Sequence, residues 1–236
     1  MDKKNVWDDV WSKEKKVIYP NPIVIHTIIN LDIKSVIELG GGSGNDIIEL
    51  NNKGLEVVYS DNSSVAISNF NKKTDNKIKA VKLNVLDRFP FPDNFFDLVY
   101  SLGLLEHFNK NQREQIIKEM FRISKKYVLV DVPKKYSFLT LVKKALMSTG
   151  RWKYGWETEF SYNQLVKECM DVTNCKPLKT YCRGFLPLPR RFKEKFSHGF
   201  FNIGMNSLFL DLQRNYNVPI LFNCMGILFK KMSSKK

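Results

Sequence analysis

Three alternating glycines follow a short apolar segment and could form the floor of a ligand site. Gly40, Gly42 and Gly44 come after a predicted strand at residues 35–39 and open a predicted helix at about residues 44–52. Glycines at such a turn let the backbone bend tightly and let a ligand touch the main chain. A generic strand-to-helix turn would also use glycine, so the site needs further support.

The spacing of these glycines argues against a dinucleotide. A dinucleotide-binding turn follows G-x-G-x-x-G, which from Gly40 would require a glycine where Asn45 stands. Glu38, at the end of the strand, would repel a phosphate and attract an ammonium or sulfonium group. S-adenosyl-L-methionine carries both of these cations, so the pattern favours it as the cofactor. The alternative is that Glu38 is a strand-end charge that faces solvent.

Asp61 supplies a second carboxylate at the end of the next predicted strand, residues 55–60. An acidic residue about 20 positions beyond the glycines is the usual partner of ribose hydroxyls, because a carboxylate can accept both hydroxyl hydrogens. A strand-end aspartate is also a common helix cap. Taken together with Glu38 and the glycines, Asp61 favours a ligand that carries a ribose.

Strands and helices alternate around these residues. The spacing of Trp7, Val10 and Trp11 predicts an N-terminal helix, and Asn21-Pro22 predicts the start of a second. A capping box of Ser161 and Gln164 predicts a helix that ends near residue 170. Further helices are expected at 63–71 and around 116–121, and strands at 35–39, 55–60, 78–83, 96–101, 127–132, 177–181 and 219–229.

This order predicts an α/β fold: a Rossmann-like three-layer sandwich with a mostly parallel seven-stranded sheet. Its crossovers should be right-handed, and ligands should bind at the carboxyl ends of the strands. We expect one domain over residues 1–236, with N-terminal helices in 1–33 and a cofactor-binding core in 34–132. Residues 133–160 and 184–216 are expected to be insertions that cap the substrate.

Three segments taken in order resemble the class I S-adenosylmethionine-dependent methyltransferases. They are residues 36–44 (VIELGGGSG), 57–63 (VVYSDNS) and 89–101 (FPFPDNFFDLVYS), the last continuing into LLEHF at 104–108. The resemblance covers about residues 34–132 and is to the methyltransferase type 11 group, which includes ubiquinone and menaquinone methylases. Each segment alone is weak evidence, whereas the ordered combination is specific.

The resemblance implies a cofactor role for ten residues. Glu38, Gly40, Gly42 and Gly44 would hold the methionine moiety. Asp61 would bind the ribose, with Asn62 beside the adenine. Asn84 and Val85 would lie along the adenine edge, and Ser101 and Leu102 would line the pocket wall. Many relatives have an acidic residue at the position of Val85, whereas the nearest acid in this chain is Asp87. The adenine contacts therefore depart from the family pattern.

His107 is the candidate catalytic residue. It follows the fourth predicted strand, near the place where the methyl group should emerge, and histidine can accept a proton near neutral pH. The alternative is that residues 105–108 form a structural turn common to the family. The sequence does not show whether the methyl acceptor must lose a proton at all.

The methyl acceptor is expected to be a small molecule or a lipid-linked compound. Residues 100–103 read Tyr-Ser-Leu-Gly rather than the D/N-P-P-Y/W of amino-methylases of bases, and no Pro-Cys nucleophile for C5-cytosine methylation occurs. Aromatic residues of the insertions could cover an apolar substrate or could simply pack against the sheet: Trp152, Tyr154, Trp156, Phe185, Phe192 and Phe196.

The formal net charge of +14 leaves two alternatives open. A basic surface could bind RNA or lipid head groups, or the charge could follow from a composition rich in Lys, Asn and Ile. Lysine outnumbers arginine, the residue that nucleic-acid readers tend to use. An RNA methyltransferase and a non-catalytic cofactor-binding partner subunit are kept as alternatives. Basic residues that could meet an anionic group or a membrane surface, or merely be solvated, are Arg183, Arg190, Arg191, Lys193 and Lys195.

The remaining composition indicates a cytoplasmic protein without a metal site. The N-terminus lacks the apolar region of a secretory signal, and the most apolar stretch, residues 218–229, is too short for a membrane span. The four cysteines, Cys169, Cys175, Cys182 and Cys224, match no zinc pattern. We therefore expect free thiols in a reducing compartment.

Overall fold

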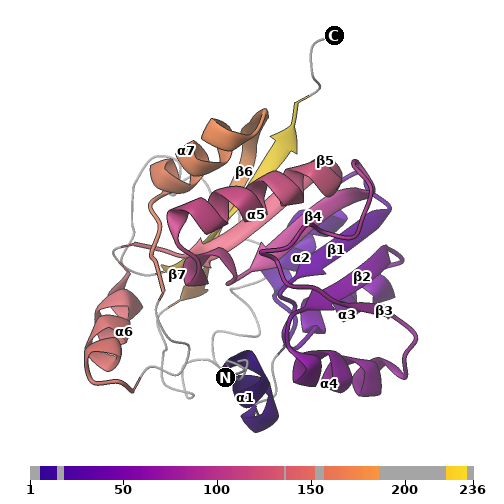
Figure 1. Ribbon diagram of the computed structural model, residues 1–236. Coiled ribbons are helices and arrows are strands. Elements are labelled where there is room, and N and C mark those ends of the chain that lie inside the picture. Colours follow the sequence, from indigo (N-terminus) through magenta and orange to yellow (C-terminus); the bar gives the residue numbers. More distant parts are fainter. Residues whose placement is uncertain (1–5, 15–18, 136, 152–156, 186–221, 233–236) are drawn as a thin grey trace, which may run out of the picture.

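A computed structural model describes residues 6–14, 19–135, 137–151, 157–185 and 222–232. These residues form a seven-stranded sheet between two layers of helices (Figure 1). The strands are β1 (Ser35–Leu39), β2 (Glu56–Asp61), β3 (Lys79–Lys82), β4 (Phe96–Leu102), β5 (Ser124–Pro133), β6 (Cys175–Phe185) and β7 (Phe222–Lys231). Their order in the sheet is β3-β2-β1-β4-β5-β7-β6, and β7 runs antiparallel to both neighbours. The prediction of a mostly parallel seven-stranded sheet is confirmed.

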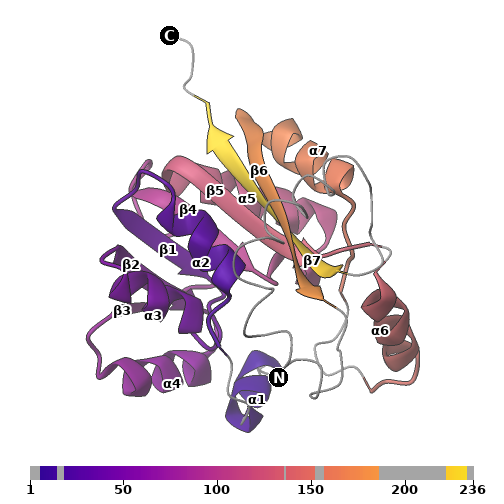
Figure 2. The same ribbon diagram turned by 180° about the vertical axis from the view of Figure 1, so that it is seen from behind.

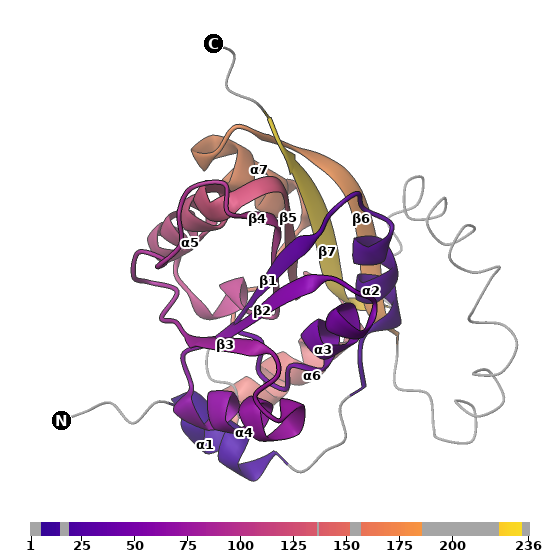
Figure 3. The same cartoon turned by 90° about the vertical axis from the view of Figure 1, so that its right-hand side faces the viewer.

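The helices cover both faces of this sheet. They are α1 (Val6–Lys13), α2 (Pro22–Ile29), α3 (Asn45–Asn52), α4 (Ser64–Thr74), α5 (Lys110–Ile123), α6 (Phe138–Ser148) and α7 (Tyr162–Val172), with a short 3-10 turn η1 (Leu105–His107). Helices α5 and α7 lie on one face, and α2 and α3 lie on the other (Figures 1 and 2). Figure 3 shows the sheet between these layers.

Alternation along the strands divides the apolar core into two halves. In β1, Ile37 packs in the core that α5 and α7 cover, and its neighbour Val36 packs in the core that α2 and α3 cover. Successive side chains of a strand point to opposite faces, and a strand covered on both faces needs apolar residues at nearly every position. This requirement explains the continuous apolar run that made the strand recognisable in the sequence.

The chain reverses its winding direction between β1 and β4. The β1–α3–β2 connection leads to one side of β1, whereas β4 and β5 lie on its other side. The crevice at such a switch point, outside the carboxyl ends of the strands, is where ligands bind in open α/β sheets. The glycine run at residues 40–44 follows β1 directly and therefore lies at this point.

Two segments of the second half hold structure that the sequence did not predict. Residues 133–160, expected to be an insertion, contain α6, whose N-cap Ser137 accepts a hydrogen bond from the Thr140 N–H at 3.1 Å. At α7, Ser161 caps the helix but the Gln164 side chain does not close a capping box. Its Nε2 donates to Glu168 at 3.1 Å, a contact that turns the side chain along the helix towards Glu168.

The C-terminal strands also differ in extent from the prediction. Strand β6 spans eleven residues rather than five, with an irregularity in its pairing near Leu178. Strand β7 begins at Phe222, so the predicted start at Pro219 lies outside the described residues. Most of the predicted insertion at 184–216 lies outside them too.

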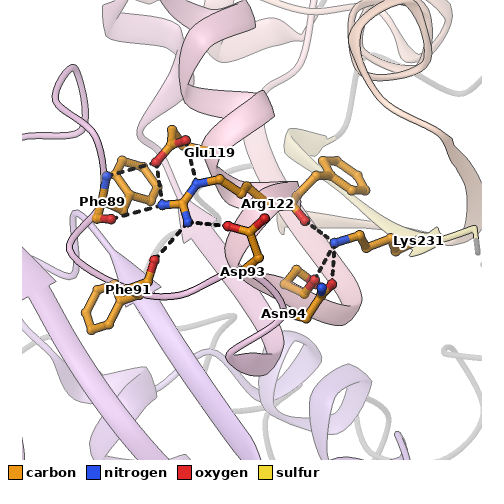
Figure 4. A network of polar contacts seen from close by, with 9 residues as sticks. Phe89, Phe91, Asp93, Asn94, Glu119, Arg122 and Lys231 are labelled. Carbon is orange, nitrogen blue, oxygen red and sulfur yellow. Dashed lines mark hydrogen bonds and ion pairs between the residues drawn. The ribbon is translucent and has the colours of Figure 1, made fainter. Parts of the chain in front are cut away.

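One arginine holds the proline-rich loop before β4. The Arg122 guanidinium donates to the backbone oxygens of Phe89 and Phe91 at 2.9 and 2.8 Å. It also pairs with Glu119 at 2.7 Å and with Asp93 at 2.8 Å (Figure 4). These contacts connect the loop to α5 and so fix the entry of the chain into β4.

Among the described residues, no helix is both long enough and apolar enough to cross a membrane.

Candidate active site

A cavity of about 720 Å³ lies at the carboxyl edge of the sheet. Residues at or just beyond the ends of β1, β2, β4, β5 and β6 line it, and α1 and α6 contribute further residues. Both helices lie beyond this edge of the sheet (Figures 1 and 2). The cavity therefore occupies the place at which the topology predicts a ligand.

The turn after β1 forms one wall of this cavity: Gly40, Gly41, Gly42 and Ser43 line it, whereas Gly44 does not. The turn leaves no space for side chains at Gly42 and Gly44. Gly42 and Gly44 have φ of 53° and 67°, a left-handed conformation that favours glycine. A Cβ atom on Gly42 would lie 2.3 Å from the Trp11 ring, and one on Gly44 would lie 2.2 Å from Phe70. The turn therefore packs directly against these two aromatic rings, and only glycine fits at the two positions.

Glu38 is buried at the base of the cavity. Its side chain belongs to a residue that is 3 % exposed, and its Oε2 atom has no hydrogen-bond partner among the described residues. Burial, together with the nearby Asp46 carboxylate, raises the pKa of Glu38 well above its ordinary value. The alternative of a solvent-facing charge is therefore wrong. A buried carboxylate without a partner is costly, and a cationic ligand would remove that cost.

Asp61 joins the glycine run to the start of α4. Its Oδ2 accepts the Gly42 N–H at 2.9 Å, and its Oδ1 accepts the Ser63 N–H at 2.8 Å. Ser63, rather than Asp61, is the N-cap of α4. Each carboxylate oxygen can accept more than one hydrogen, so Asp61 keeps acceptor capacity on the cavity that it lines.

The other residues expected at the cofactor divide into two groups. Asn62, Asn84, Val85 and Leu102 line the cavity. Ser101 does not, because it is fully buried in β4 and its hydroxyl finds no hydrogen-bond partner among the described residues.

His107 lines the cavity from η1 and is half-buried. Its ring packs edge-on against Trp7 of α1, with 4.8 Å between the ring centroids. Helix α1 is held in turn by Asp8, which accepts a 2.5 Å hydrogen bond from the Ser63 hydroxyl. The N-terminal helix therefore closes one side of the cavity.

Glu106 is the site residue that the sequence prediction missed. It is 4 % exposed, it lines the cavity, and its Oε2 atom has no hydrogen-bond partner among the described residues. Burial is the main cause that raises the pKa of Glu106 to about 8, and the Glu157 and Asp131 carboxylates add to the shift. Glu106 is the neighbour of His107 in the sequence. The spacing of residues in a short 3-10 turn does not reveal which of their side chains points into the cavity.

The two basic residues of the cavity are each paired with carboxylates. Arg183 makes two hydrogen bonds to Asp131, at 2.8 and 2.6 Å. Lys143 lies 3.1 Å from Glu157 and 3.2 Å from Glu159. Arg183, expected on a basic surface, thus lies in the cavity in an ion pair.

Several expected residues lie outside the described part of the chain. They are the basic residues Arg190, Arg191, Lys193 and Lys195, the aromatic residues Trp152, Tyr154, Trp156, Phe192 and Phe196, and the side chain of Phe185. In the described part, no cluster of three His, Cys, Asp or Glu residues could hold a metal ion. The four cysteines are free thiols.

Comparison with known proteins identifies the domain. Residues 36–127 match the family model of a methyltransferase domain. The chain therefore contains a methyltransferase domain over these residues. The match includes β1, the glycine run, β2 and β4, which are the elements that build this wall of the cavity. No curated protein matches the methyltransferase at significant similarity.

Solved structures share the fold of the methyltransferase at low sequence identity. Magnesium protoporphyrin IX methyltransferase from Synechocystis PCC 6803 is 13% identical, with 96% of this chain and 84% of that chain covered and a TM-score of 0.61. A S-adenosylmethionine-dependent methyltransferase from Methanosarcina mazei is 15% identical, with coverages of 92% and 100% and a TM-score of 0.64. Geranyl diphosphate C-methyltransferase from Streptomyces coelicolor A3(2) is 12% identical, with coverages of 89% and 77% and a TM-score of 0.59.

Proposed function

We propose that the protein transfers the methyl group of S-adenosyl-L-methionine to a small-molecule or lipid-linked acceptor inside the cavity at the carboxyl edge of the sheet. The observation that carries the proposal is that one cavity is lined by polar residues from both ends of the sheet edge. Towards the β2 end they include Gly40, Gly42, Glu38 and Asp61, and towards the β6 end they include Glu106, Lys143 and Arg183. A methyl donor and an acceptor would thus meet in one cavity.

The residues at the first end fit the cofactor. Glu38 has a buried oxygen without a partner, which suits the ammonium group of the methionine moiety. Gly40, Gly41 and Gly42 line the cavity without side chains, so their main chain can contact that moiety. Asp61 keeps acceptor capacity for the ribose hydroxyls.

The remaining cofactor contacts follow from the same placement. Asn62, Asn84 and Val85 line the side of the cavity beyond β2 and β3, where the adenine would lie, and Leu102 lines the wall at the end of β4. Ser101 would act through the backbone of β4 rather than as a lining side chain, because it is fully buried.

The chemistry asks the protein mainly to position the acceptor. The bound cofactor supplies an activated methyl group on a sulfonium. The chain must hold the nucleophile in line with that methyl and keep water away. Trp7, Trp11 and Phe108 line the cavity and would exclude water from it. His107 stays a candidate to contact the acceptor, with its ring oriented by Trp7.

The four free thiols support a reducing compartment, and we propose the cytoplasm.

A screen of acceptors tests the proposal. Purified protein is incubated with cofactor carrying a labelled methyl group and with a cell extract separated into small molecules, lipids and RNA. We expect label in the small-molecule or lipid fraction and its loss in an Asp61→Ala variant. Label that appears only in RNA would contradict the proposed acceptor class.

A further inference from the structure

We propose that the methyl acceptor is a primary or secondary amine that binds as an ammonium ion against Glu106, and that Glu106 accepts its proton before methyl transfer. This inference rests on the proposed function, because it assigns the acceptor of the same cavity. It names a substrate class and a catalytic residue that the family match does not assign.

The position of Glu106 is fixed by the backbone on both sides of the cavity. The Glu106 carbonyl accepts the Thr158 N–H at 2.8 Å, and the Gly103 N–H donates to the Asp131 carbonyl at 2.9 Å. Glu106 therefore lies beside the carboxyl ends of β4 and β5, whereas Glu38 and Asp61 are at the carboxyl ends of β1 and β2. Glu106 thus lies across the switch point from Glu38 and Asp61, and we assign its side to the acceptor.

The side chain of Glu106 lacks the partner that its burial requires. It is more than nine-tenths buried, and Oε2 has no hydrogen-bond partner among the described residues. Buried ionisable groups are normally paired, because an unpaired one costs several kcal/mol of desolvation. An N–H donor that carries positive charge satisfies both the hydrogen-bonding and the charge requirement.

The charge of the cavity points to the same class of ligand. Among the described residues that line it, five are carboxylates (Glu38, Asp46, Asp61, Glu106 and Glu157) and two are cations (Lys143 and Arg183). Both cations are already in ion pairs with carboxylates. The cavity thus has an excess of acidic over basic side chains, although the net charge of the protein as a whole is +14. Burial raises the pKa of Glu38, Asp46, Asp61 and Glu106, and a bound cation would favour their ionised forms. An anionic acceptor would be repelled, whereas an ammonium would be attracted.

The proton transfer and the methyl transfer balance without a further reactant. The ammonium N–H passes its proton to Oε2 of Glu106, which leaves a neutral amine and a carboxylic acid. The nitrogen lone pair then forms the N–CH₃ bond while the S–CH₃ bond of the cofactor breaks and its electron pair stays on sulfur. The product is an N-methylammonium ion and S-adenosylhomocysteine, and the proton leaves Glu106 when the site reopens.

The surroundings of Glu106 suit it to this proton transfer. The groups that face it are the carboxylates of Glu157 and Asp131, the guanidinium of Arg183 on β6 and the thiol of Cys224 on β7. Burial, with the Glu157 and Asp131 carboxylates, raises the pKa of Glu106 to about 8, so Glu106 is mostly protonated at pH 7 when the site is empty. An ammonium ion bound against it favours the ionised form, which is the form that accepts the proton. The pKa of Glu106 is closer to that of an alkylammonium ion, about 10, than the pKa of an ordinary carboxyl is. Transfer of the proton from the ammonium to Glu106 is therefore less unfavourable.

Binding of three probes of the same shape tests the inference. Benzylamine, benzyl alcohol and benzoate are titrated into the protein saturated with S-adenosylhomocysteine at pH 7. We expect benzylamine to bind at least 10-fold more tightly than the alcohol, with benzoate the weakest. Glu106→Gln should weaken benzylamine about 10-fold and leave benzyl alcohol unchanged, and Glu106→Asp should restore part of the preference. Glu114→Gln, on α5 outside the cavity, serves as the matched control.

The outcomes separate this inference from the proposed function. Equal binding of the three probes, no binding, a preference for benzoate, or a benzylamine affinity unchanged in Glu106→Gln would each overturn the amine assignment. The affinity for S-adenosylhomocysteine is measured on the same samples. If the protein binds S-adenosylhomocysteine but shows no preference for the amine, the inference fails and the proposed function stands. If the unmodified protein does not bind S-adenosylhomocysteine, the proposed function itself fails.

Discussion

Replacing Glu106 with glutamine should change how the stability of the protein depends on pH. The pKa of Glu106 is about 8 in the folded chain, against an ordinary value of 4.5. The folded state therefore binds this proton more tightly than the unfolded state does. Its stabilising effect is complete below pH 4.5 and is lost as pH rises through pH 8.

The size of the effect follows from the two pKa values. At 1.36 kcal/mol for each pKa unit, the folded state loses on the order of 4 kcal/mol between pH 5 and pH 9 through this one group. Glutamine cannot ionise, so any cost of its buried amide is the same at every pH. The unfolding free energy of the variant should consequently rise relative to the unmodified protein as pH increases.

Urea denaturation at pH 5, 6, 7, 8 and 9 measures this difference directly. Other buried carboxyls, such as Glu38, also contribute to the pH dependence, but they are present in both proteins and cancel in the difference. Glu56→Gln removes an exposed carboxyl of β2 and should follow the unmodified protein throughout. Parallel curves for Glu106→Gln and the unmodified protein would refute the buried, unpaired state of Glu106.

Three further substitutions test other parts of the structure. Arg122→Ala should destabilise the protein by about 3 kcal/mol, whereas exposed Arg88→Ala should change little; similar urea midpoints for both would contradict the role of Arg122. Gly44→Ala adds a steric clash to backbone strain and should cost about 2–4 kcal/mol, but Gly54→Ala, with open space around it, about 1 kcal/mol. An equal cost at both would show that the turn is not crowded. Glu38→Gln should weaken S-adenosylhomocysteine at least 10-fold in calorimetry yet leave 5′-methylthioadenosine, which lacks the ammonium, unchanged; equal losses for both ligands would place Glu38 away from the methionine moiety.

The fold was predictable where the sequence pattern is repetitive. The apolar run before Gly40 marks a strand that is buried on both faces, and the alternation of such runs with helices determines the layers. Helix α6 was missed because the segment around it lacks strong start and stop signals, and Ser137 forms its cap without a Glu or Gln three residues later. The capping box at α7 was mispredicted because the Gln164 side chain binds Glu168 instead. The orientation of Glu168 depends in turn on its ion pair with Arg113, a residue that is distant in the sequence.

The residues that line the cavity were predictable at the ends of β1 and β2, where we propose that the cofactor binds, and not near β5 and β6, where we propose that the acceptor binds. Glu38 and Asp61 lie at the ends of adjacent strands, so strand prediction alone brings them together. Glu106, Lys143 and Arg183 come from a 3-10 turn, a helix and the end of β6. These three side chains line the same cavity only because of tertiary packing, which the spacing of residues in the sequence does not predict.

Calorimetric titration of S-adenosylhomocysteine tests the central claim most directly. The unmodified protein should bind one equivalent. Asp61→Ala should weaken binding at least 10-fold, because the ribose loses its acceptor and the Gly42 N–H of the glycine turn loses the carboxylate to which it donates. Asp87→Ala, in the exposed loop after β3, should bind like the unmodified protein. Absence of binding to the unmodified protein, or equal affinity in Asp61→Ala, would contradict the assignment of this cavity to the cofactor.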